Sequence, residues 1–234
     1  MAFTIVAPAY NEGEVIAAFV GDVVAMLGDD DVLLVVDDGS TDSTAEVLEE
    51  LKKTHRQLRS ISHPSNRGLG AALGTGFSGV RSEVVVTMDS DLSHPRELIP
   101  VLVAACSTAD AAFASRFVAG GSMDGVPWVR AVISRLGNAV LRSLLRVPVR
   151  DTTTGFRAYR REALAGLRLH GTGFEVQLEI TTRLVHARAT IVEVPLALRV
   201  RAAGKSKMRY LRLIPTYGRM TLRLMALRWR PRGW

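Results

Sequence analysis

Short apolar runs rich in valine and isoleucine alternate with segments of helical periodicity through the first half of this chain. Five of these runs are predicted to be β-strands, at residues 4–8, 32–37, 58–62, 83–88 and 111–115. Four helices are predicted between them, at residues 14–27, 43–55, 69–80 and 95–106. Strands and helices that alternate in this way form a mostly parallel sheet with helices on both faces, so an α/β fold is expected.

The second half of the chain lacks the regular alternation of strands and helices. Helices are predicted at residues 127–145 and 174–185, and a strand at residues 190–200. A chain of 234 residues with 47% apolar residues can bury a substantial core. No internal repeat or low-complexity linker divides it, so we expect one catalytic domain over residues 1–207 and a basic amphipathic tail over residues 208–234.

Positive charge is concentrated near the C-terminal end. The net charge is +7, no Asp or Glu follows Glu193, and Lys and Arg recur from Arg199 to Arg232. Such a segment favours an anionic partner, either a membrane surface or nucleic acid. Nucleic acid is the weaker alternative, because Leu, Ile and Met alternate with the basic residues and base-stacking aromatics are sparse.

The N-terminal segment and the single cysteine bear on location. The chain opens on a predicted strand rather than on a charged segment followed by an apolar one, so a secretory signal is not expected. No apolar run approaches the ~18 to 20 residues that span a bilayer. Cys106 is expected to be a small buried hydrophobic residue, and with no second cysteine for an intrachain disulfide it favours a reducing compartment. We therefore expect a cytoplasmic protein, soluble or peripherally bound to a membrane.

Three polar clusters follow predicted strands. They are Tyr-Asn-Glu at residues 10–12, Asp-Asp-Gly-Ser at 37–40 and Asp-Ser-Asp at 89–91. Ligands of open parallel sheets bind at the carboxyl ends of the strands, so these clusters are expected to share one cleft.

Asp89 and Asp91 are the candidate metal ligands. Two carboxylates one residue apart at the end of a buried strand oppose each other's ionisation unless a cation lies between them. Oxygen ligands of this kind suit Mg²⁺ or Mn²⁺, and Mg²⁺ is often held by one or two carboxylates together with substrate phosphates. The alternative is a loop with an aspartate helix cap before Pro95, and His94 is interpreted as a turn residue rather than a ligand.

The Asp37-Asp38 pair has two interpretations. The segment is a strand end, a turn and a helix start, in which Ser40 or Asp42 caps the helix. One of the acids can instead accept hydrogen bonds from a base or a ribose, as acids do in other nucleotide sites.

A competing hypothesis rests on the glycines near residue 70. Gly68-x-Gly70 opens a predicted helix, and Asp89 ends the next strand about twenty residues later, as in a Rossmann dinucleotide fingerprint. That fingerprint needs its glycines immediately after a strand, whereas here they follow the loop at residues 63–67. A nucleotide-dependent oxidoreductase is therefore the weaker alternative.

Taken together, the motifs resemble the inverting family 2 glycosyltransferases, and among them the dolichol-phosphate or polyprenol-phosphate mannosyltransferases. Eight segments occur in the family's order and cover nearly the whole chain. They are PAYNE at 8–12, VDDGS at 36–40, NRGLG at 66–70, DSDLSHP at 89–95, SRF at 115–117, ISR at 133–135, TGFR at 154–157 and RAAGKSK at 201–207.

The resemblance implies a GT-A-like nucleotide-diphospho-sugar transferase fold, with mannose moved from GDP-mannose to a polyprenyl or dolichyl phosphate. Another nucleotide sugar, such as UDP-glucose, is the alternative donor. The implied donor-binding residues are Pro8, Tyr10, Glu12, Asp37, Asp38, Gly68, Asp89 and Ser90. Asp89 and Asp91 would hold Mg²⁺ or Mn²⁺. Asp91, Arg116, Arg135 and Arg201 are the implied catalytic residues, and Ser134, Arg135, Arg201 and Lys207 the implied acceptor-phosphate residues.

Two departures from the family pattern stand out. Ser93 occupies the position where these synthases usually carry a glutamine ligand, which leaves the third protein ligand open. Phe-Glu-Val-Gln at residues 174–177 replaces the usual Phe-Gln-x-Glu order, which bears on acceptor or sugar recognition.

No side chain stands out as a general base. A phosphate acceptor needs none, because its second pKa of about 6 leaves it largely anionic near neutral pH.

Two segments have the pattern of interfacial helices. From Trp128 to Leu145, and again from Met208 to Trp229, apolar residues repeat at helical spacing beside arginines. Both are expected to bind the cytoplasmic face of a membrane, the alternative being that both stripes pack on the protein core. Pro215 and Gly218 are expected to kink or divide the second helix. A membrane partner subunit is a further candidate partner.

Overall fold

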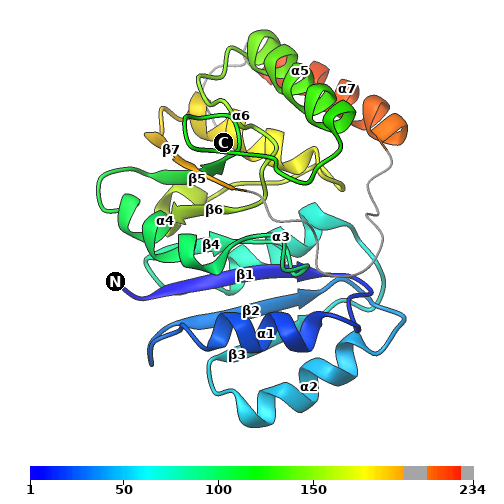
Figure 1. The fold of residues 1–234 in the computed structure, drawn as a ribbon, viewed down its shortest axis with the longest axis vertical. Helices are drawn as coiled ribbons and strands as arrows, with labels where there is room; N and C mark the ends of the chain where they lie inside the picture. Colours follow the sequence, from blue (N-terminus) through cyan, green and yellow to red (C-terminus); the bar gives the residue numbers. More distant parts are fainter. Residues whose placement is uncertain (198–209, 228–234) are drawn as a thin grey trace.

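A computed structural model describes residues 1–197 and 210–227 of the chain. Its centre is a seven-stranded sheet in the order β3-β2-β1-β4-β6-β5-β7 (Figure 1). The strands are β1 (Phe3–Ala9), β2 (Val32–Asp37), β3 (Leu58–Ser62), β4 (Val84–Thr87), β5 (Ala111–Ser115), β6 (Arg157–Arg160) and β7 (Ile191–Pro195). Strands β1 to β4 pair in parallel, as do β5 and β7. The predicted α/β class with a mostly parallel sheet is confirmed.

Strand β6 was not predicted. It lies between β4 and β5 and runs antiparallel to both, with Arg157 opposite Thr87 of β4. The sequence gives little sign of this strand, because it has only four residues, Arg-Ala-Tyr-Arg, and an arginine stands at each end. The two inner residues of this strand are buried, and so is Arg157.

Helices cover both faces of the sheet (Figure 1). They are α1 (Ile16–Val24), α2 (Thr44–Thr54), α3 (Leu69–Gly79), α4 (Ile99–Ala105), α5 (Trp128–Leu145), α6 (Val176–His186) and α7 (Tyr210–Leu227). Successive strand residues point to opposite faces, so Ile5 and Ala7 of β1 join one core cluster, with α1, α2 and α4, while Val6 joins the other. The second cluster contains residues of α3, α6 and α7.

Most of the predicted boundaries lie within two residues of those observed. The largest helical difference is at residues 95–106, where a 3₁₀ turn (Arg96–Leu98) precedes α4. Pro100 lies in the first turn of α4, where its missing N–H costs no helical hydrogen bond. The strand expected at 190–200 is observed as β7, and the last part of that range lies outside the described residues.

Helix α7 lies beside α5 and also contacts α6 (Figure 1). Its inner face buries Met220 and Leu224 in the second core cluster. Pro215 and Gly218 were expected to kink or divide this helix; they do not divide it, because α7 is continuous with Pro215 inside it, and the kink stays a prediction. We attribute its continuity to this packing, which offsets the hydrogen bond lost at the proline. Helix α7 thus packs on α5 and α6, and the expected division into a catalytic domain and a tail stays a prediction.

Cys106 is buried beside α4, and burial raises the pKa of its thiol to about 11. This fits the expected role as a small hydrophobic residue.

Within residues 1–197 and 210–227, none of the helices has the length and apolar character that a bilayer crossing requires.

Candidate functional site

The carboxyl ends of β1 and β4 meet at one edge of the sheet. The hydroxyl of Ser90 donates to the carbonyl oxygen of Pro8 at 3.0 Å, which ties the loop after β4 to β1. The hydroxyl of Thr87 donates to the carbonyl oxygen of Gly155 at 2.8 Å. Tyr10 is half-buried at the same edge. The structure thus brings the donor-site candidates of β1 and β4 together, as expected from the parallel order.

Asp89 projects from this edge against the Thr-Gly-Phe segment. Its side chain is 41% exposed, so it is accessible to a ligand. A Cβ on Gly155 would lie 3.0 Å from Oδ1 of Asp89 and 3.6 Å from Nε2 of Gln177. Gly155 therefore makes room for the Asp89 carboxylate, and the side-chain amide of Gln177 on α6 approaches the same glycine.

His94 orients Asp89 and is more than a turn residue. Its Nδ1 accepts the backbone N–H of Asp89 at 3.1 Å, so Nε2 carries the proton of the neutral ring. That Nε2 lies 3.8 Å from Oδ2 of Asp89. The ring is buried and stacks on Phe156, with 4.8 Å between ring centroids. The histidine thus fixes the backbone from which the first carboxylate projects.

Asp91 and Ser93 complete the turn after β4. Oδ1 of Asp91 accepts the backbone N–H of Ser93 at 3.0 Å, and Ser93 is buried. Within the described residues, no cluster of three or more His, Cys, Asp or Glu side chains is arranged to hold a metal ion. Two neighbouring carboxylates, one of them accessible, fit a Mg²⁺ or Mn²⁺ ion whose other ligands are phosphate oxygens and water.

The loops after β1 and β2 interlock. Ser40 Oγ accepts the backbone N–H of Asn11 at 2.9 Å, and Asn11 Oδ1 accepts that of Thr41 at 2.8 Å. The backbone N–H of Glu12 donates to Thr44 Oγ1 at 2.9 Å. These contacts tie Glu12 to the start of α2 and give Ser40 a role between the loops. Of the two residues expected to cap the helix, Asp42 is the one that accepts the backbone N–H of Thr44, the first residue of α2, at 3.0 Å.

Asp37 and Asp38 are both buried, and each binds part of a loop. Asp37 accepts the backbone N–H of Ser40 at 3.0 Å. Asp38 accepts the backbone N–H groups of Arg67 and Gly68, at 3.0 and 2.7 Å. Its Oδ1 also lies 2.7 Å from Nδ1 of His63. Asp38 thus anchors the loop at residues 63–68 to the end of β2, and its expected contact with the nucleoside stays a prediction.

The glycines of the competing Rossmann interpretation serve protein packing. Gly68 has a φ of +91°, and a Cβ there would lie 2.2 Å from the carbonyl oxygen of Thr172. A Cβ on Gly70 would lie 1.8 Å from the carbonyl oxygen of Gly171. Two carbonyl oxygens of the chain itself thus lie against the start of α3, where a dinucleotide fingerprint would bind a pyrophosphate. This arrangement disfavours the oxidoreductase alternative.

Arg116 forms an ion pair with the fully buried Asp151, and its expected catalytic role stays a prediction. Its Nε and Nη2 donate to the two carboxylate oxygens of Asp151, each at 2.7 Å, and Nη2 also donates to Thr153 Oγ1 at 2.9 Å. Burial acts to raise the pKa of Asp151, but the hydrogen bonds and charge of Arg116 hold it below its ordinary value. Asn138 of α5 accepts the N–H and O–H of Thr152, which joins this network to α5.

The acceptor candidates are only partly described. Arg135 is exposed on α5, and the half-buried Ser134 has its carbonyl oxygen 3.2 Å from Nδ2 of Asn138. Arg201 and Lys207 lie outside the described residues. The structure therefore links the carbonyl oxygen of Ser134 to the Arg116 network through Asn138, and the acceptor roles of all four residues stay predictions.

Sequence reasoning missed the role of Arg157. Its guanidinium is fully buried at the start of β6, 4.0 Å from the centroid of the Phe113 ring. Nη1 donates to the carbonyl oxygen of Gln177 at 3.0 Å, and Nη2 to that of Thr152 at 2.9 Å. Arg157 thus joins α6 to the loop that holds Arg116. The resemblance included this arginine in a motif, but a charged residue in a four-residue strand gives little sign of burial.

Helix α7 borders the same polar region. Burial raises the pKa of Tyr217 on α7, and the carboxylate of Glu175 raises it further. Oε1 of Glu175 accepts the backbone N–H groups of Thr172 and Gly173, at 3.1 and 2.9 Å. Glu175 thereby shapes the loop that precedes α6, where the sequence departs from the family order.

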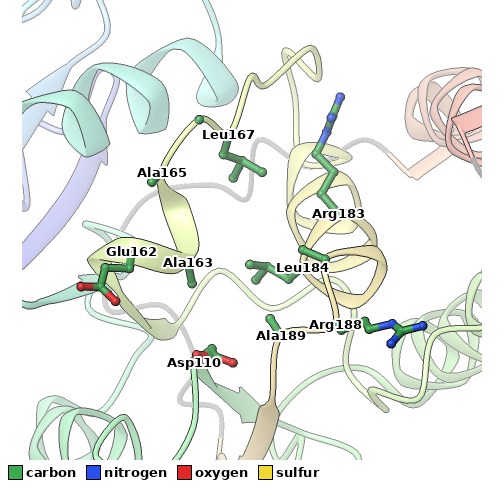
Figure 2. A pocket seen from close by; sticks show the side chains of 11 residues that line it. Asp110, Glu162, Ala163, Ala165, Leu167, Arg183, Leu184, Arg188 and Ala189 are labelled. Atoms are coloured by element: carbon green, nitrogen blue, oxygen red, sulfur yellow. The ribbon is translucent and has the colours of Figure 1, made fainter. Parts of the chain in front are cut away.

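A separate pocket of about 350 Å³ lies at the opposite edge of the sheet (Figure 2). Asp110, just before β5, and Glu162, just after β6, line it together with the last turn of α6. The carboxyl ends of β1 and β4 are at the other edge, so this pocket is no part of the candidate active site.

Residues 4–168 match the family described as glycosyl transferase family 2. The chain belongs to this family. It is 39% identical over 212 residues to a polyprenol monophosphomannose synthase of Mycolicibacterium smegmatis, covering 87% of this chain and 80% of that protein. It is 35% identical to an undecaprenyl-phosphate mannosyltransferase of Micrococcus luteus, with 86% and 85% covered. A dolichol-phosphate mannosyltransferase of Pyrococcus furiosus is 33% identical, and this chain spans 60% of its length.

Solved structures agree with the fold. A glucosyl-3-phosphoglycerate synthase of Mycobacterium tuberculosis with Mg²⁺ and uridine diphosphate matches with a TM-score of 0.69 and 26% identity, covering 97% of this chain and 79% of that one. The complex of that protein with phosphoglyceric acid matches with a TM-score of 0.72 and 24% identity. The glycosyltransferase is therefore of the GT-A-like class expected from the motifs.

Proposed function

We propose that this glycosyltransferase moves mannose from GDP-mannose to a polyprenyl phosphate, with inversion at the anomeric carbon and with a divalent cation. The observation that carries the proposal is the pair Asp89 and Asp91 at the end of β4, with Asp89 accessible and held by His94. The names of three relatives at 33 to 39% identity support a lipid-phosphate acceptor and a mannosyl donor.

In this proposal the donor lies across the carboxyl ends of β1, β2 and β4. Asp89 and Asp91 hold the cation, which supplies positive charge to the departing diphosphate. His94 keeps Asp89 in position, and Gly155 leaves room for the carboxylate. The loop anchored by Asp38 borders the nucleoside.

The acceptor phosphate binds on the side of α5. Arg135 and Arg201 pair with its oxygens, because a guanidinium matches a phosphate with two parallel hydrogen bonds. Arg116 holds the loop before β6 through Asp151. The phosphate attacks as an anion, so no side chain has to remove a proton at neutral pH.

We further propose that α5 and α7 attach the enzyme to the cytoplasmic face of a membrane. Trp128, Leu136 and Val140 of α5 are 77%, 63% and 57% exposed. Val132 and Leu144 continue the same four-residue spacing and are also exposed, so this stripe does not pack on the core. Arginines of both helices flank the exposed apolar residues, a combination typical of interfacial helices. A membrane partner subunit is the alternative occupant of this surface.

A second donor class is favoured by one observation. The similar M. tuberculosis structure binds uridine diphosphate, so UDP-glucose is the alternative to GDP-mannose. The deciding experiment is a panel of nucleotide sugars offered with a short polyprenyl phosphate, with and without Mn²⁺. Transfer from GDP-mannose that needs the metal supports the proposal. Transfer from a UDP-sugar alone would show that the donor is not GDP-mannose. Absence of transfer from every nucleotide sugar would overturn the proposed function.

A further inference from the structure

Helix α5 carries a buried polar side chain on its inner face. The structure describes the whole of this helix, and Asn138 and Leu145 are its two buried residues. Leu145 lies at the C-terminal end, in the second core cluster. Residues 128–137 are exposed or half-buried, whereas Asn138 is 3% exposed. Asn138 is therefore the first point along α5 at which the helix is buried, and Ser134 and Arg135 lie just before it.

The side-chain amide of Asn138 makes all of its hydrogen bonds within the chain. Nδ2 donates to the carbonyl oxygen of Ser134 at 3.2 Å and to Oγ1 of Thr153 at 3.1 Å. Oδ1 accepts the backbone N–H and the hydroxyl of Thr152, at 2.9 and 2.8 Å. A primary amide offers two donors and two lone pairs, so none is left for a ligand. Sliding or turning α5 would leave buried polar atoms unpaired, so this amide fixes one register of the helix against the loop before β6.

The hydroxyl of Thr153 joins this amide to Arg116. Its oxygen accepts hydrogen bonds from Nδ2 of Asn138 and from Nη2 of Arg116, at 3.1 and 2.9 Å. Its own proton is directed to Oδ1 of Asp151, at 3.3 Å. Both lone pairs and the proton of this hydroxyl are therefore used. Thr153 thus couples α5 directly to the Arg116–Asp151 pair.

The position of Asn138 on the helix connects this network to the acceptor candidates. Ser134 and Arg135 precede it by four and three residues, and side chains at these spacings are neighbours on one face of a helix. The register that Asn138 fixes therefore also places Ser134 and Arg135.

We propose that Asn138 and Thr153 are positioning residues for the acceptor. They hold Ser134 and Arg135 of α5 at a fixed distance from Arg116, and they do so without touching the phosphate. The inference rests on the proposed function, which places the acceptor phosphate on the side of α5. A misplacement of about 1 Å between reacting groups costs up to about 100-fold in rate, so the loss of such positioning is measurable.

The first test changes one oxygen atom. Thr153→Val keeps the size and branching of the side chain and removes Oγ1, whereas Thr153→Ser keeps the oxygen. With a short polyprenyl phosphate and the nucleotide sugar that the wild type uses, Thr153→Val should lower kcat/KM for the acceptor by about 10-fold. Thr153→Ser should stay close to the wild type. Binding of the nucleoside diphosphate with Mn²⁺ should be unchanged in both variants, because a positioning role on the acceptor side leaves the donor untouched.

The second test changes the other end of the link. Asn138→Leu should lower kcat/KM for the acceptor in the same way. The double variant Asn138→Leu with Thr153→Val should lose little more than Asn138→Leu alone, because both changes break one network. Ser143→Ala, at an exposed position of the same helix, is the matched control and should change nothing. If Asn138→Leu does not fold, the comparison of Thr153→Val with Thr153→Ser decides alone.

Four results would overturn the inference. They are wild-type acceptor kinetics in Thr153→Val, an equal loss in Thr153→Ser, weaker binding of the nucleoside diphosphate to the same extent as the acceptor, and fully additive losses in the double variant. A loosened fold would produce the third result, since it weakens donor and acceptor alike. A wild type that transfers no sugar to a polyprenyl phosphate would instead overturn the proposed function.

Discussion

Arg116 and Asp151 form a two-pronged ion pair beneath the proposed acceptor site, with both N–O distances at 2.7 Å. Asp151 is fully buried, and the Arg116 side chain is 14% exposed. The pair joins the end of β5 to the loop before β6, and Asn138 connects that loop to α5. The ion pair and Asn138 together tie the loop before β6 to α5, the helix that carries Ser134 and Arg135.

Replacing Asp151 by asparagine should destabilise the fold by about 3 to 5 kcal/mol at pH 7, because it leaves a buried guanidinium without its counter-charge. Urea denaturation measures the change. Asp29→Asn is the control, since Asp29 pairs with Arg56 at a largely exposed position where ion pairs contribute little. Equal changes in the two variants would contradict the structural role.

The Arg116–Asp151 pair should make the stability of the fold depend on pH in the acidic range. The pKa of Asp151 is lowered in the folded state, so its contribution is complete above the ordinary value of 3.8 and is lost as the pH falls below it. The stability difference between wild type and Asp151→Asn should therefore shrink between about pH 5 and pH 3. A difference that stays constant over this range would show that the carboxylate does not titrate with folding.

Removal of either proposed metal ligand should abolish transfer and leave the fold intact. Asp89→Ala or Asp91→Ala takes away a carboxylate that offsets the charge of the cation and the diphosphate. Turnover, Mn²⁺ binding in the presence of nucleotide and thermal melting are measured together, with the exposed Asp30→Ala as control. Full activity of either variant, or of the wild type in metal-free buffer, would remove the metal assignment.

Gly155→Ala tests the space beside Asp89. The added Cβ would lie 3.0 Å from Oδ1, so the carboxylate must shift by a few tenths of an ångström. We expect kcat to fall by about 10-fold and the Mn²⁺ concentration for half-maximal rate to rise. Gly21→Ala is the matched control, because no atom lies within 4 Å of its Cβ position. Unchanged metal dependence in Gly155→Ala would mean that the carboxylate has room to move.

The parallel sheet of the first half could be predicted from the sequence, because the apolar runs at β1, β2 and β4 are buried on both faces and form continuous apolar segments. The position of the candidate site could be predicted too, because ligands of open parallel sheets bind at the carboxyl ends of the strands. Strand β6 could not be predicted, since its Arg-Ala-Tyr-Arg sequence is stabilised by long-range contacts of Arg157 with Gln177 and Thr152. The buried pairing of Arg116 was hidden for the same reason, since Asp151 lies 35 residues further along the chain.

Arg135 is predicted to act on the acceptor rather than on the donor. Its side chain is exposed, so Arg135→Ala should leave the melting temperature unchanged while raising KM for the polyprenyl phosphate by about 10-fold or more. Arg201→Ala should act in the same direction. Donor affinity is measured in parallel, with the exposed Arg81→Ala as control. If both variants keep wild-type acceptor kinetics, the acceptor pocket lies elsewhere.

Membrane attachment is predicted to depend on the exposed stripe of α5 and the outer face of α7. A truncation after Lys207 would not test this cleanly, because it would remove Met220 and Leu224 from the core. Single substitutions avoid that problem. Leu136→Glu on α5 and Leu222→Glu on α7 change side chains that are 63% and 70% exposed, so the fold should persist.

Each substitution should reduce co-sedimentation with anionic liposomes, because it replaces an inserted apolar group by a charge that anionic lipids repel. Binding of the wild type should rise with the anionic lipid fraction and fall with salt, since each nearby Lys or Arg contributes about 1 kcal/mol.

Val101→Glu is the matched control. Val101 is also apolar and is 49% exposed, but it lies on α4, which packs with the other core cluster. Loss of binding in this control as well would point to a general charge effect. Wild-type binding in both test variants would remove α5 and α7 from the attachment surface, and a wild type that binds no liposomes would count against the lipid acceptor itself.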